Sequence, residues 1–262
     1  DNLKATMHIL ILNPNSSQDM TRGMLAATDA LKLGDSIKIS TYTAPSTAPA
    51  SINDDTDIKA SEEAVCQDIA DKSLSLDQYD AVLVACFSVH TLVPRLPTLT
   101  SASVTGIFEA SILTAQLLLQ PYTDQKWGIV TTGKFWEDHL SAGVRSFFGQ
   151  APRGDLGQGG SSSSSNFAGV FSTGLTAGDF HHLPQAEVDA KLREATGKLL
   201  KAGDVRCVVM GCGGMAGLER VIRSTAAELI GEDFARGLYV VDGVRAGVLQ
   251  LEQLVRSKQV FV

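Results

Sequence analysis

Two stretches of this chain are closely similar: Tyr79-Asp-Ala-Val-Leu-Val-Ala-Cys86 and Val205-Arg-Cys-Val-Val-Met-Gly-Cys212. Each is an apolar run rich in β-branched residues that ends at a cysteine and continues into a loop of small and polar residues. Such a run is typical of a strand buried in a parallel sheet, and ligands of α/β proteins bind at the carboxyl ends of these strands. The matched pair therefore indicates two thiols that face one substrate from opposite sides.

Strand-like runs alternate with helical patterns along the chain, which is the signature of an α/β protein with parallel sheet. The expected strands are residues 8–12, 37–41, 81–85, 104–108, 127–131, 207–211 and 238–242. The expected helices are residues 18–31, 57–73, 111–120, 135–148, 185–202, 218–230 and 245–257.

The ends of the strands repeat in the two halves of the chain. A loop residue, a cysteine and an acid lie at the ends of three strands in each half, in the same order: Asn13, Cys86 and Glu109, then Thr131, Cys212 and Asp242. Three features that recur in one order at similar spacing predict an internal duplication. We expect the two acids to orient loops or cap helices rather than to touch a substrate.

The bulk composition is that of a soluble globular protein: 262 residues, 44% hydrophobic and 19% charged. A net charge of −7 argues against nucleic-acid or membrane partners. No apolar run reaches the ~18–20 residues that span a bilayer, and no secretory signal is visible. Four cysteines are too sparse for a disulfide framework. We therefore expect a cytoplasmic protein with reduced thiols and a small-molecule substrate.

Two facing thiols can invert a carbon that carries an acidic hydrogen. One thiolate removes the proton from one face, and a thiol delivers a proton to the other. The unperturbed pKa of a cysteine thiol, ~8.5, lets both forms exist near neutral pH, and helix amino termini or N–H donors stabilise the thiolate. No metal or organic cofactor is needed. Packing is the alternative for a buried cysteine, and we expect it for Cys66, in a helix, and for Cys207, at the start of a strand.

The loop after the first expected strand begins Asn13-Pro-Asn-Ser16-Ser17. Pro14 favours extended geometry at Asn13, and Ser16 or Ser17 can cap the following helix. The loop lacks the glycine patterns of nucleotide-binding loops. Its amide and hydroxyl groups would lie at the ligand-binding edge of the sheet; a purely structural turn is the alternative.

Residues 154–166 consist mostly of glycine and serine. This composition is typical of a flexible tether, because it cannot offset the entropy of ordering. We consider two interpretations, a disordered surface insertion and a mobile flap over the site.

Four motifs resemble those of the aspartate/glutamate/hydantoin racemase superfamily, in particular its hydantoin and allantoin racemase branch with fungal-type members. They are Asn13-Pro-Asn-Ser16, Ala85-Cys86-Phe87, Gly106-Ile-Phe-Glu109 and Gly211-Cys212-Gly-Gly-Met215. The resemblance covers roughly residues 7–254, with the Gly/Ser stretch as the main unmatched part.

The resemblance implies a cofactor-independent, two-base racemase with two pseudo-symmetric, Rossmann-like α/β domains and the active site in the cleft between them. It implies that residues 1–103 plus 219–262 form the domain with Cys86, and residues 104–218 the domain with Cys212, because the strand after each cysteine crosses over in such proteins. It also favours a homo-oligomer.

The resemblance further assigns site residues. Cys86 and Cys212 match the two catalytic positions. Substrate contacts are implied for residues of the strand-end loops and for those next to the cysteines: Asn13, Ser16, Phe87, Ser88, Thr131, Thr132, Gly213 and Gly214.

One departure follows the first cysteine. The chain has Phe87-Ser-Val-His90 where bacterial hydantoin racemases usually carry an Asp-Pro pair. His90 could tune Cys86 or contact substrate; a histidine that is solvated or satisfied in the core is the alternative.

The leading hypothesis is racemisation of a 5-substituted hydantoin, with allantoin, an intermediate of purine catabolism, as the natural candidate. A carbonyl beside C5 stabilises the carbanion as an enolate, and donors aimed at the oxyanion lower the barrier further. The alternatives are a maleate-type cis–trans isomerase with covalent cysteine catalysis, a cysteine hydrolase that uses Cys86 with His90 and Glu109, and a metabolite-binding protein without catalysis.

Overall fold

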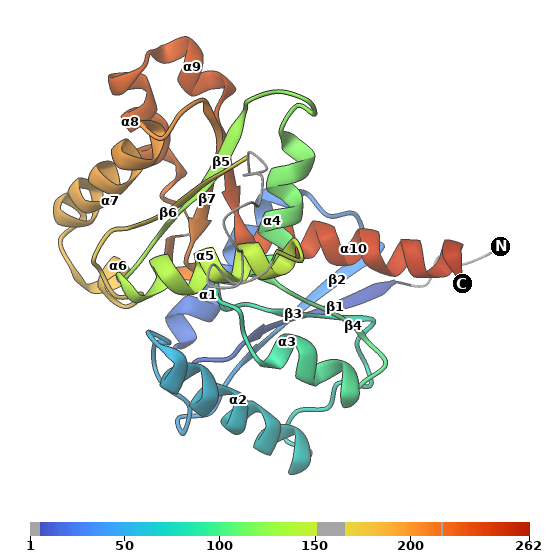
Figure 1. Ribbon diagram of the computed structural model, residues 1–262. Coiled ribbons are helices and arrows are strands. Elements are labelled where there is room, and N and C mark those ends of the chain that lie inside the picture. The colour runs from blue at the N-terminus through green and yellow to red at the C-terminus, as the bar shows by residue number, and fades with distance from the viewer. Residues whose placement is uncertain (1–5, 151–165, 216) are drawn as a thin grey trace. The chain divides into compact units, whose positions relative to one another are not determined.

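The computed structural model describes residues 6–150, 166–215 and 217–262, and its strands and helices alternate along the chain (Figure 1). The strands are β1 (Met7–Asn13), β2 (Ile37–Thr43), β3 (Ala81–Val84), β4 (Ser103–Gly106), β5 (Lys126–Thr131), β6 (Phe167–Ser172), β7 (Val205–Gly211) and β8 (Tyr239–Asp242). The helices are α1 (Gln18–Thr28), α2 (Asp55–Ala70), α3 (Leu92–Arg95), α4 (Ile107–Leu118), α5 (Phe135–Phe147), α6 (Asp179–His182), α7 (Gln185–Leu200), α8 (Glu219–Leu229), α9 (Glu232–Gly237) and α10 (Gly243–Phe261).

The strands form two parallel sheets with the same strand order, β2-β1-β3-β4 and β6-β5-β7-β8. The order is identical once β1–β4 are replaced by β5–β8. The predicted pair of pseudo-symmetric α/β domains with parallel sheets is confirmed.

The chain divides into a first unit, residues up to Ser111 together with Asp242–Val262, and a second unit, Ile112–Val241. These boundaries differ from the expected 1–103 plus 219–262 and 104–218. The reason is that β4 pairs with β3, with Gly106 opposite Val84, and β8 lies beside β7. The strand after each cysteine therefore stays in its own sheet, and the chain changes units only after that strand.

The sheet of the first unit is covered on both faces. Leu10, Leu12, Val82 and Val84 are fully buried and belong to one core cluster with residues of α2 and α3. The carboxyl-terminal helix α10 packs on β1, β3 and β4 and lies along this sheet (Figure 1). Burial on both faces explains why β1 and β3 are continuous apolar runs instead of alternating ones.

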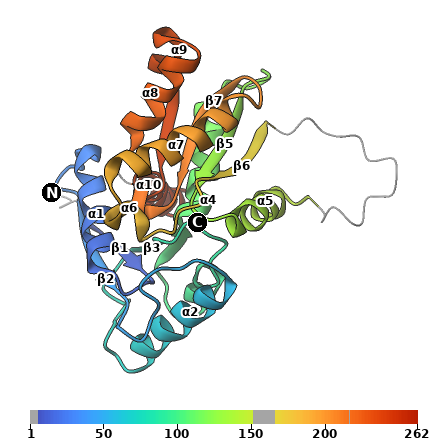
Figure 2. The same ribbon diagram turned by 90° about the vertical axis from the view of Figure 1, so that its left-hand side faces the viewer.

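The second unit repeats this arrangement. Val130 of β5 and Val208 of β7 share a core cluster with Leu192 of α7 and Ile222 of α8. Figure 2 shows α5 and α7 on the two sides of β6, and both helices contact that strand. Within residues 6–150, 166–215 and 217–262, no helix combines the length and apolar character needed to cross a bilayer.

Several elements differ from the sequence-based expectations, among them the short helices α3, α6 and α9, which were not predicted. Strand β6 was not predicted: Gly169 takes a φ of +122° beside a shift in the β5–β6 register, and such an irregularity interrupts the alternation that identifies a strand. Residues 104–108 were expected to be extended, but the chain enters α4 at Ile107. The predicted Gly/Ser insertion lies outside the described residues except for Asn166.

Two helical glycines provide a test of how α10 packs. A Cβ atom at Gly247 would lie 2.7 Å from Cδ2 and 3.1 Å from Cγ of the fully buried Leu83. Gly247→Ala should therefore lower the free energy of unfolding by about 1–3 kcal/mol. Gly23 of α1 has nothing within 4 Å of an added Cβ, so Gly23→Ala should raise it by about 0.5–1 kcal/mol through helix propensity. Urea unfolding followed by circular dichroism measures both, and a Gly247→Ala variant as stable as wild type would contradict this packing.

Candidate active site

The first unit presents Cys86 in a turn just beyond β3. Ala85 extends the strand pairing by donating its N–H to the carbonyl of Leu12 at 2.8 Å. The N–H of Ser88 then donates to the carbonyl of Cys86 at 3.0 Å, and the Ser88 hydroxyl donates to Cys86 Sγ at 3.4 Å. The Cys86 side chain is partly exposed, whereas Ser88 is completely buried. The turn thus holds the Cys86 sulfur at the carboxyl edge of the sheet, hydrogen-bonded to the buried Ser88 hydroxyl.

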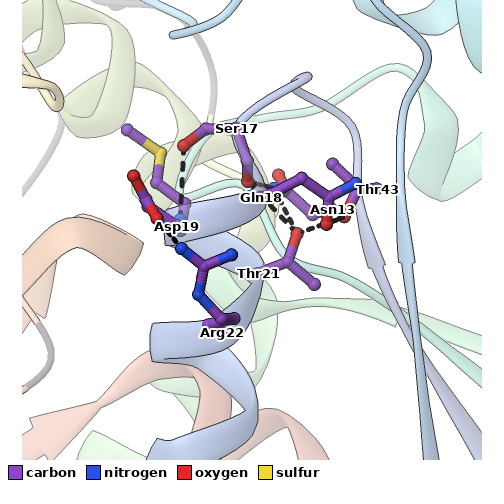
Figure 3. A network of polar contacts seen from close by, with 8 residues as sticks. Asn13, Ser17, Gln18, Asp19, Thr21, Arg22 and Thr43 are labelled. Atoms are coloured by element: carbon purple, nitrogen blue, oxygen red, sulfur yellow. Dashed lines mark hydrogen bonds and ion pairs between the residues drawn. The ribbon is translucent and has the colours of Figure 1, made fainter.

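Asn13, at the end of β1, organises the loop before α1 (Figure 3). Its side chain is completely buried. Nδ2 donates to Asn15 Oδ1 at 2.9 Å, to the Ser17 carbonyl at 3.2 Å and to Thr21 Oγ1 at 3.0 Å, and Oδ1 accepts from the Asn15 N–H at 3.2 Å. Three acceptors exceed the two hydrogens of an amide nitrogen. Asn13 therefore has no side-chain donor left for a substrate.

Ser16 and Ser17 anchor the same loop in different ways. Ser16 donates its hydroxyl to the Ala48 carbonyl at 3.1 Å and its N–H to the Pro49 carbonyl at 2.9 Å. Ser17 is the amino-terminal cap of α1, and its hydroxyl accepts from the Met20 N–H at 3.3 Å. Of the two serines expected to cap the helix, Ser17 does so, and Ser16 ties the loop to the segment after β2.

Phe87 places its side chain in the core of the first unit. Only 5% of it is exposed, and its ring meets that of Phe108 edge to face at 5.6 Å between centroids. Gly243, at the start of α10, packs closely against the same ring. The Phe87 side chain therefore belongs to the core, and its contact with substrate stays a prediction.

His90 is a core histidine with 1% exposure. The Leu92 N–H lies 3.2 Å from Nδ1, which makes this nitrogen the acceptor, so Nε2 donates to Ser61 Oγ at 3.1 Å. Ser61 in turn donates to the Ile58 carbonyl at 2.7 Å. Burial lowers the pKa of His90 to about 4. With both ring nitrogens engaged, His90 is a poor general base for Cys86, which disfavours the cysteine hydrolase.

Glu109, in the first turn of α4, is the least compensated polar group of the first unit. Its Oε2 is buried without a hydrogen-bond partner among the described residues, and burial raises the pKa of the carboxyl group to about 7. The carboxyl group lies so close to Gly106 that any Cβ there would collide with it, and Val93 Cγ2 would be only 2.9 Å away. This close approach explains the glycine three residues before the acid.

The second unit presents Cys212 directly after β7. The Thr131 hydroxyl donates to the Gly211 carbonyl at 2.8 Å, which locks the end of β5 to the end of β7. A Cβ at Gly211 would lie 2.7 Å from Ile129 Cγ2 and 3.0 Å from the carbonyl oxygen of Val130. Only glycine therefore allows the two strands to approach so closely just before the cysteine.

A 3₁₀ turn, Gly213–Met215, follows Cys212. The Gly214 N–H donates to Cys212 Sγ at 3.3 Å, and the Met215 N–H donates to the Cys212 carbonyl at 3.1 Å. Burial raises the pKa of the Cys212 thiol to about 11, although the N–H groups of Gly214 and Met215 act in the opposite direction. Near neutral pH, Cys212 is a thiol.

Thr132 and Gly214 form hydrogen bonds through their backbones. The carbonyl of Thr132 accepts from the Gly174 N–H at 3.0 Å and from Thr173 Oγ1 at 3.4 Å. The Thr132 side chain is buried, as is Gly214, whereas Gly213 is partly exposed. A substrate contact of the Thr131 hydroxyl would compete with its bond to the Gly211 carbonyl, and the substrate contacts of both threonines stay predictions.

The remaining candidates have structural surroundings. Asp242 caps α10 by accepting from the Arg245 N–H at 2.9 Å. Cys207 is fully buried in β7, and burial raises its pKa to about 12. Cys66 is partly buried and packs against the core of the first unit. In residues 6–150, 166–215 and 217–262, no three His, Cys, Asp or Glu side chains form a cluster suited to a metal ion.

The sequence did not identify the side chains that hydrogen-bond to His90 and to the Cys86 sulfur. Ser61 is the buried partner of His90, and its signal was a serine on the apolar face of α2 that also carries Ile58 and Val65. Ser88 was predicted to contact substrate but hydrogen-bonds the Cys86 sulfur. Its position two residues after the cysteine, equivalent to Gly214, was the available signal.

Comparisons with known proteins agree with this architecture. The family model described as Asp/Glu/Hydantoin racemase matches residues 9–251. "Uncharacterized protein C1F7.10" of Schizosaccharomyces pombe is 30% identical over 250 residues, which are 95% of this chain and 92% of the relative. The structure of allantoin racemase from Klebsiella pneumoniae has a TM-score of 0.73 at 24% identity and covers 96% of this chain and 89% of its own. Allantoin racemase from Pseudomonas fluorescens also has a TM-score of 0.73, at 22% identity, with 96% and 92% covered. The two solved structures share the fold of this chain.

The Asn13 network can be tested with an isosteric change. Asn13→Asp replaces two N–H donors with an oxygen that would face three acceptors, so it should lower the free energy of unfolding by roughly 2–4 kcal/mol at neutral pH. Asn53→Asp is the matched control, because Asn53 is half-buried and its Nδ2 donates to the Ser51 carbonyl at 3.3 Å. Urea unfolding measures the free energy of unfolding of both variants. Equal decreases in the two variants would contradict a larger stabilising effect of the Asn13 hydrogen bonds.

The contributions of His90 and Glu109 to stability depend on pH in opposite directions. An unfolded histidine gains its proton near pH 6.5 but folded His90 only near pH 4, so its contribution of about 3 kcal/mol is present above pH 6.5 and lost on acidification. Glu109, with its pKa raised from 4.5 to about 7, contributes up to about 3 kcal/mol below pH 4.5, which is lost as the pH rises to 7. Relative to wild type, Glu109→Gln should therefore lose stability, and His90→Gln gain it, by roughly 2–3 kcal/mol between pH 6.5 and 4.5.

Urea unfolding at a series of pH values measures both slopes, and the double variant is the control because both contributions are absent from it. Single variants whose stability follows the wild-type pH profile would contradict the surroundings described for these two groups.

Proposed function

This chain belongs to the Asp/Glu/hydantoin racemase family, and from that premise we propose that it is a two-cysteine racemase that inverts C5 of a 5-substituted hydantoin, with allantoin as its natural substrate. Membership of a racemase family supports an isomerase. The hydantoin substrate and the roles of Cys86 and Cys212 are the proposal.

The equivalent placement of the two cysteines carries the proposal. Cys86 follows β3 and Cys212 follows β7, which occupy the same place in two sheets of identical strand order. In each unit the sulfur accepts a hydrogen bond from the residue two positions later. A racemase acts on two mirror-image substrates and therefore needs one acid–base group for each face. Two thiols in equivalent positions of an internal repeat meet this requirement.

The reaction proceeds in two proton transfers. One cysteine, as thiolate, removes the C5 proton, and the electron pair of that C–H bond moves into the ring as an enolate on the adjacent carbonyl oxygen. The other cysteine, as thiol, then protonates C5 from the opposite face and becomes the thiolate. The product is the mirror image of the substrate, and the two cysteines have exchanged protonation states. The opposite enantiomer follows the same path in reverse.

Two observations favour a neutral ring as the substrate. Residues 85–91 and 211–215, which surround the cysteines, contain no lysine or arginine, whereas an amino-acid carboxylate calls for a cation or several donors. Both solved structures that share the fold with a TM-score of 0.73 are named as allantoin racemases.

The proposal can be tested with (S)-allantoin, and separately with 5-benzylhydantoin, in D2O. Wild type should abolish the circular dichroism signal and introduce deuterium at C5, which proton NMR detects. Cys86→Ser and Cys212→Ser should each slow racemisation by about 10²–10⁴-fold, because each removes one acid–base group. Cys66→Ser is the matched control and should retain full activity, since Cys66 packs against the core.

The isotope pattern sharpens this test. Each single variant keeps a cysteine on one face only, so it should exchange C5–H of one enantiomer without inversion, and the two variants should select opposite enantiomers. Wild type that accelerates neither hydantoin would overturn the substrate assignment. A dicarboxylate converted from cis to trans, together with a cysteine adduct detected by mass, would establish the isomerase alternative instead.

A further inference from the structure

Helices α8 and α9 of the second unit line a cavity of about 810 Å³, and the two helices lie side by side (Figure 1). This volume falls in the range of small-molecule sites, which is ~300–1,000 Å³. Charged side chains make up most of the lining: Arg220, Arg223 and Glu228 from α8, and Glu232 and Arg236 from α9. The cavity is therefore a candidate binding site for a charged ligand.

Two of these charges are neutralised by neighbouring side chains. Arg236 forms an ion pair with Asp233, which lies three residues earlier in α9. Glu228 forms an ion pair with Arg193 of α7 at 2.6 Å between Nη1 and Oε1. The charge of the cavity therefore depends on its three other charged residues.

An excess positive charge remains in the cavity. Arg220 has no ion-pair or hydrogen-bond partner in the part of the chain that the structure describes, and Arg223 bonds only to uncharged carbonyl groups. Two guanidinium groups are therefore opposed by a single carboxylate, that of Glu232. In a chain with a net charge of −7, this local surplus favours an anionic ligand.

Arg223 is held in a fixed position that leaves one edge of its guanidinium group free. Nη1 donates to the Ala235 carbonyl at 3.1 Å and to the Leu238 carbonyl at 2.7 Å, at the carboxyl end of α9. These two bonds use both hydrogens of Nη1. The N–H groups of Nε and Nη2 have no partner among the described residues. They form an edge through which arginine binds a carboxylate or phosphate with two parallel hydrogen bonds.

Arg220 brings a second guanidinium group to the same face of α8. It lies three residues before Arg223, and residues three apart are neighbours on a helix surface. Both residues are exposed, so both can reach a ligand from solvent. Because Arg223 is fixed before a ligand arrives, it loses little side-chain entropy on binding.

We propose that this cavity binds a small organic molecule with a carboxylate or phosphate group, and that Arg223 and Arg220 hold that group. Arg223 binds the anion through Nε and Nη2, and Arg220 supplies the second positive charge. The cavity is larger than a bare oxyanion, and Ala227 and Ala235 contribute methyl groups to its lining. A ligand with an apolar body therefore fits it better than an inorganic ion.

The site is separate from the edge of the sheet that carries Cys212. Arg223 bonds to Leu238, the residue before β8, whereas Cys212 follows the end of β7. In a parallel sheet, strands begin at the edge opposite to the one at which they end. The proposed ligand is therefore distinct from the substrate of the cysteines, and this inference does not depend on the racemase proposal.

Isothermal titration calorimetry near neutral pH tests the inference with three probes: benzoate, phenyl phosphate and benzamide. The first two carry the two kinds of oxyanion, and benzamide copies the shape of benzoate without its charge. Salt at physiological concentration screens attraction to isolated surface charges. Wild type should bind at least one anion at one site per chain, and benzamide at least about tenfold more weakly, because benzamide lacks the charge-assisted hydrogen bonds. The anion that binds more tightly shows whether the ligand carries a carboxylate or a phosphate.

Substitution of either arginine should weaken the binding. Arg220→Gln and Arg223→Lys should each raise the dissociation constant of the anion by about tenfold, the effect of losing one hydrogen bond to a charged group. Because Arg220 makes no bond to the described residues, Arg220→Gln should fold normally and gives a result even if Arg223→Lys does not fold. Arg22→Gln is the matched control, because Arg22 is an exposed helical arginine in α1 of the first unit; it should leave the dissociation constant unchanged.

The inference is overturned if wild type binds neither anion, if benzamide binds as tightly as the anions, or if binding is undiminished in both arginine variants. The last result would place the bound anion elsewhere on the protein. Racemisation of a hydantoin is measured separately, so failure of the proposed function and failure of this inference are seen in different experiments.

Discussion

Burial of the inner strands on both faces is the constraint on which the rest of the structure depends. β1 and β3 in one unit, and β5 and β7 in the other, are buried over most of their length, so these strands leave few positions from which a reactive group could reach solvent. Reactive groups therefore lie where the strands end. Within each sheet, parallel pairing brings the carboxyl ends of the strands to one edge, and each cysteine follows such an end in its own unit. The fold thus determines where chemistry can occur before any side chain determines what it is.

Most polar residues near these edges are engaged within their own unit. The Asn13 amide closes the loop before α1, the Thr131 hydroxyl joins β5 to β7, and His90 is bonded between Leu92 and Ser61. Because buried polar groups are costly when unpaired, residues that pattern reading assigns to substrate are often required by the loop itself. The side chains of Cys86 and Cys212, in contrast, are partly exposed at these edges.

Glu109 differs from these residues, because its carboxyl group is not fully hydrogen-bonded. Its buried oxygen has no partner in the described part of the chain, and the close approach to Gly106 leaves the carboxyl group no room to move toward β4. A neutral carboxyl group is the less costly form in such surroundings. Its pH dependence opposes that of His90, so two buried groups of the same unit offset each other's effect on stability over the mildly acidic range.

The sequence by itself determined the α/β class, the internal repeat, seven of the eight described strands and the positions of Cys86 and Cys212 at strand ends, because buried parallel strands must be apolar along their length. It did not determine β6, where Gly169 interrupts the pattern, or the points at which the chain changes units, because strand pairing is a contact between distant residues. Only the tertiary structure decided that Asn13, Phe87 and His90 serve the loops and core, and that Ser88 lies behind one sulfur where Gly214 serves the other. Hydrogen-bond partners such as Ser61 lie far along the chain, and local sequence carries no record of which distant group a polar side chain will meet.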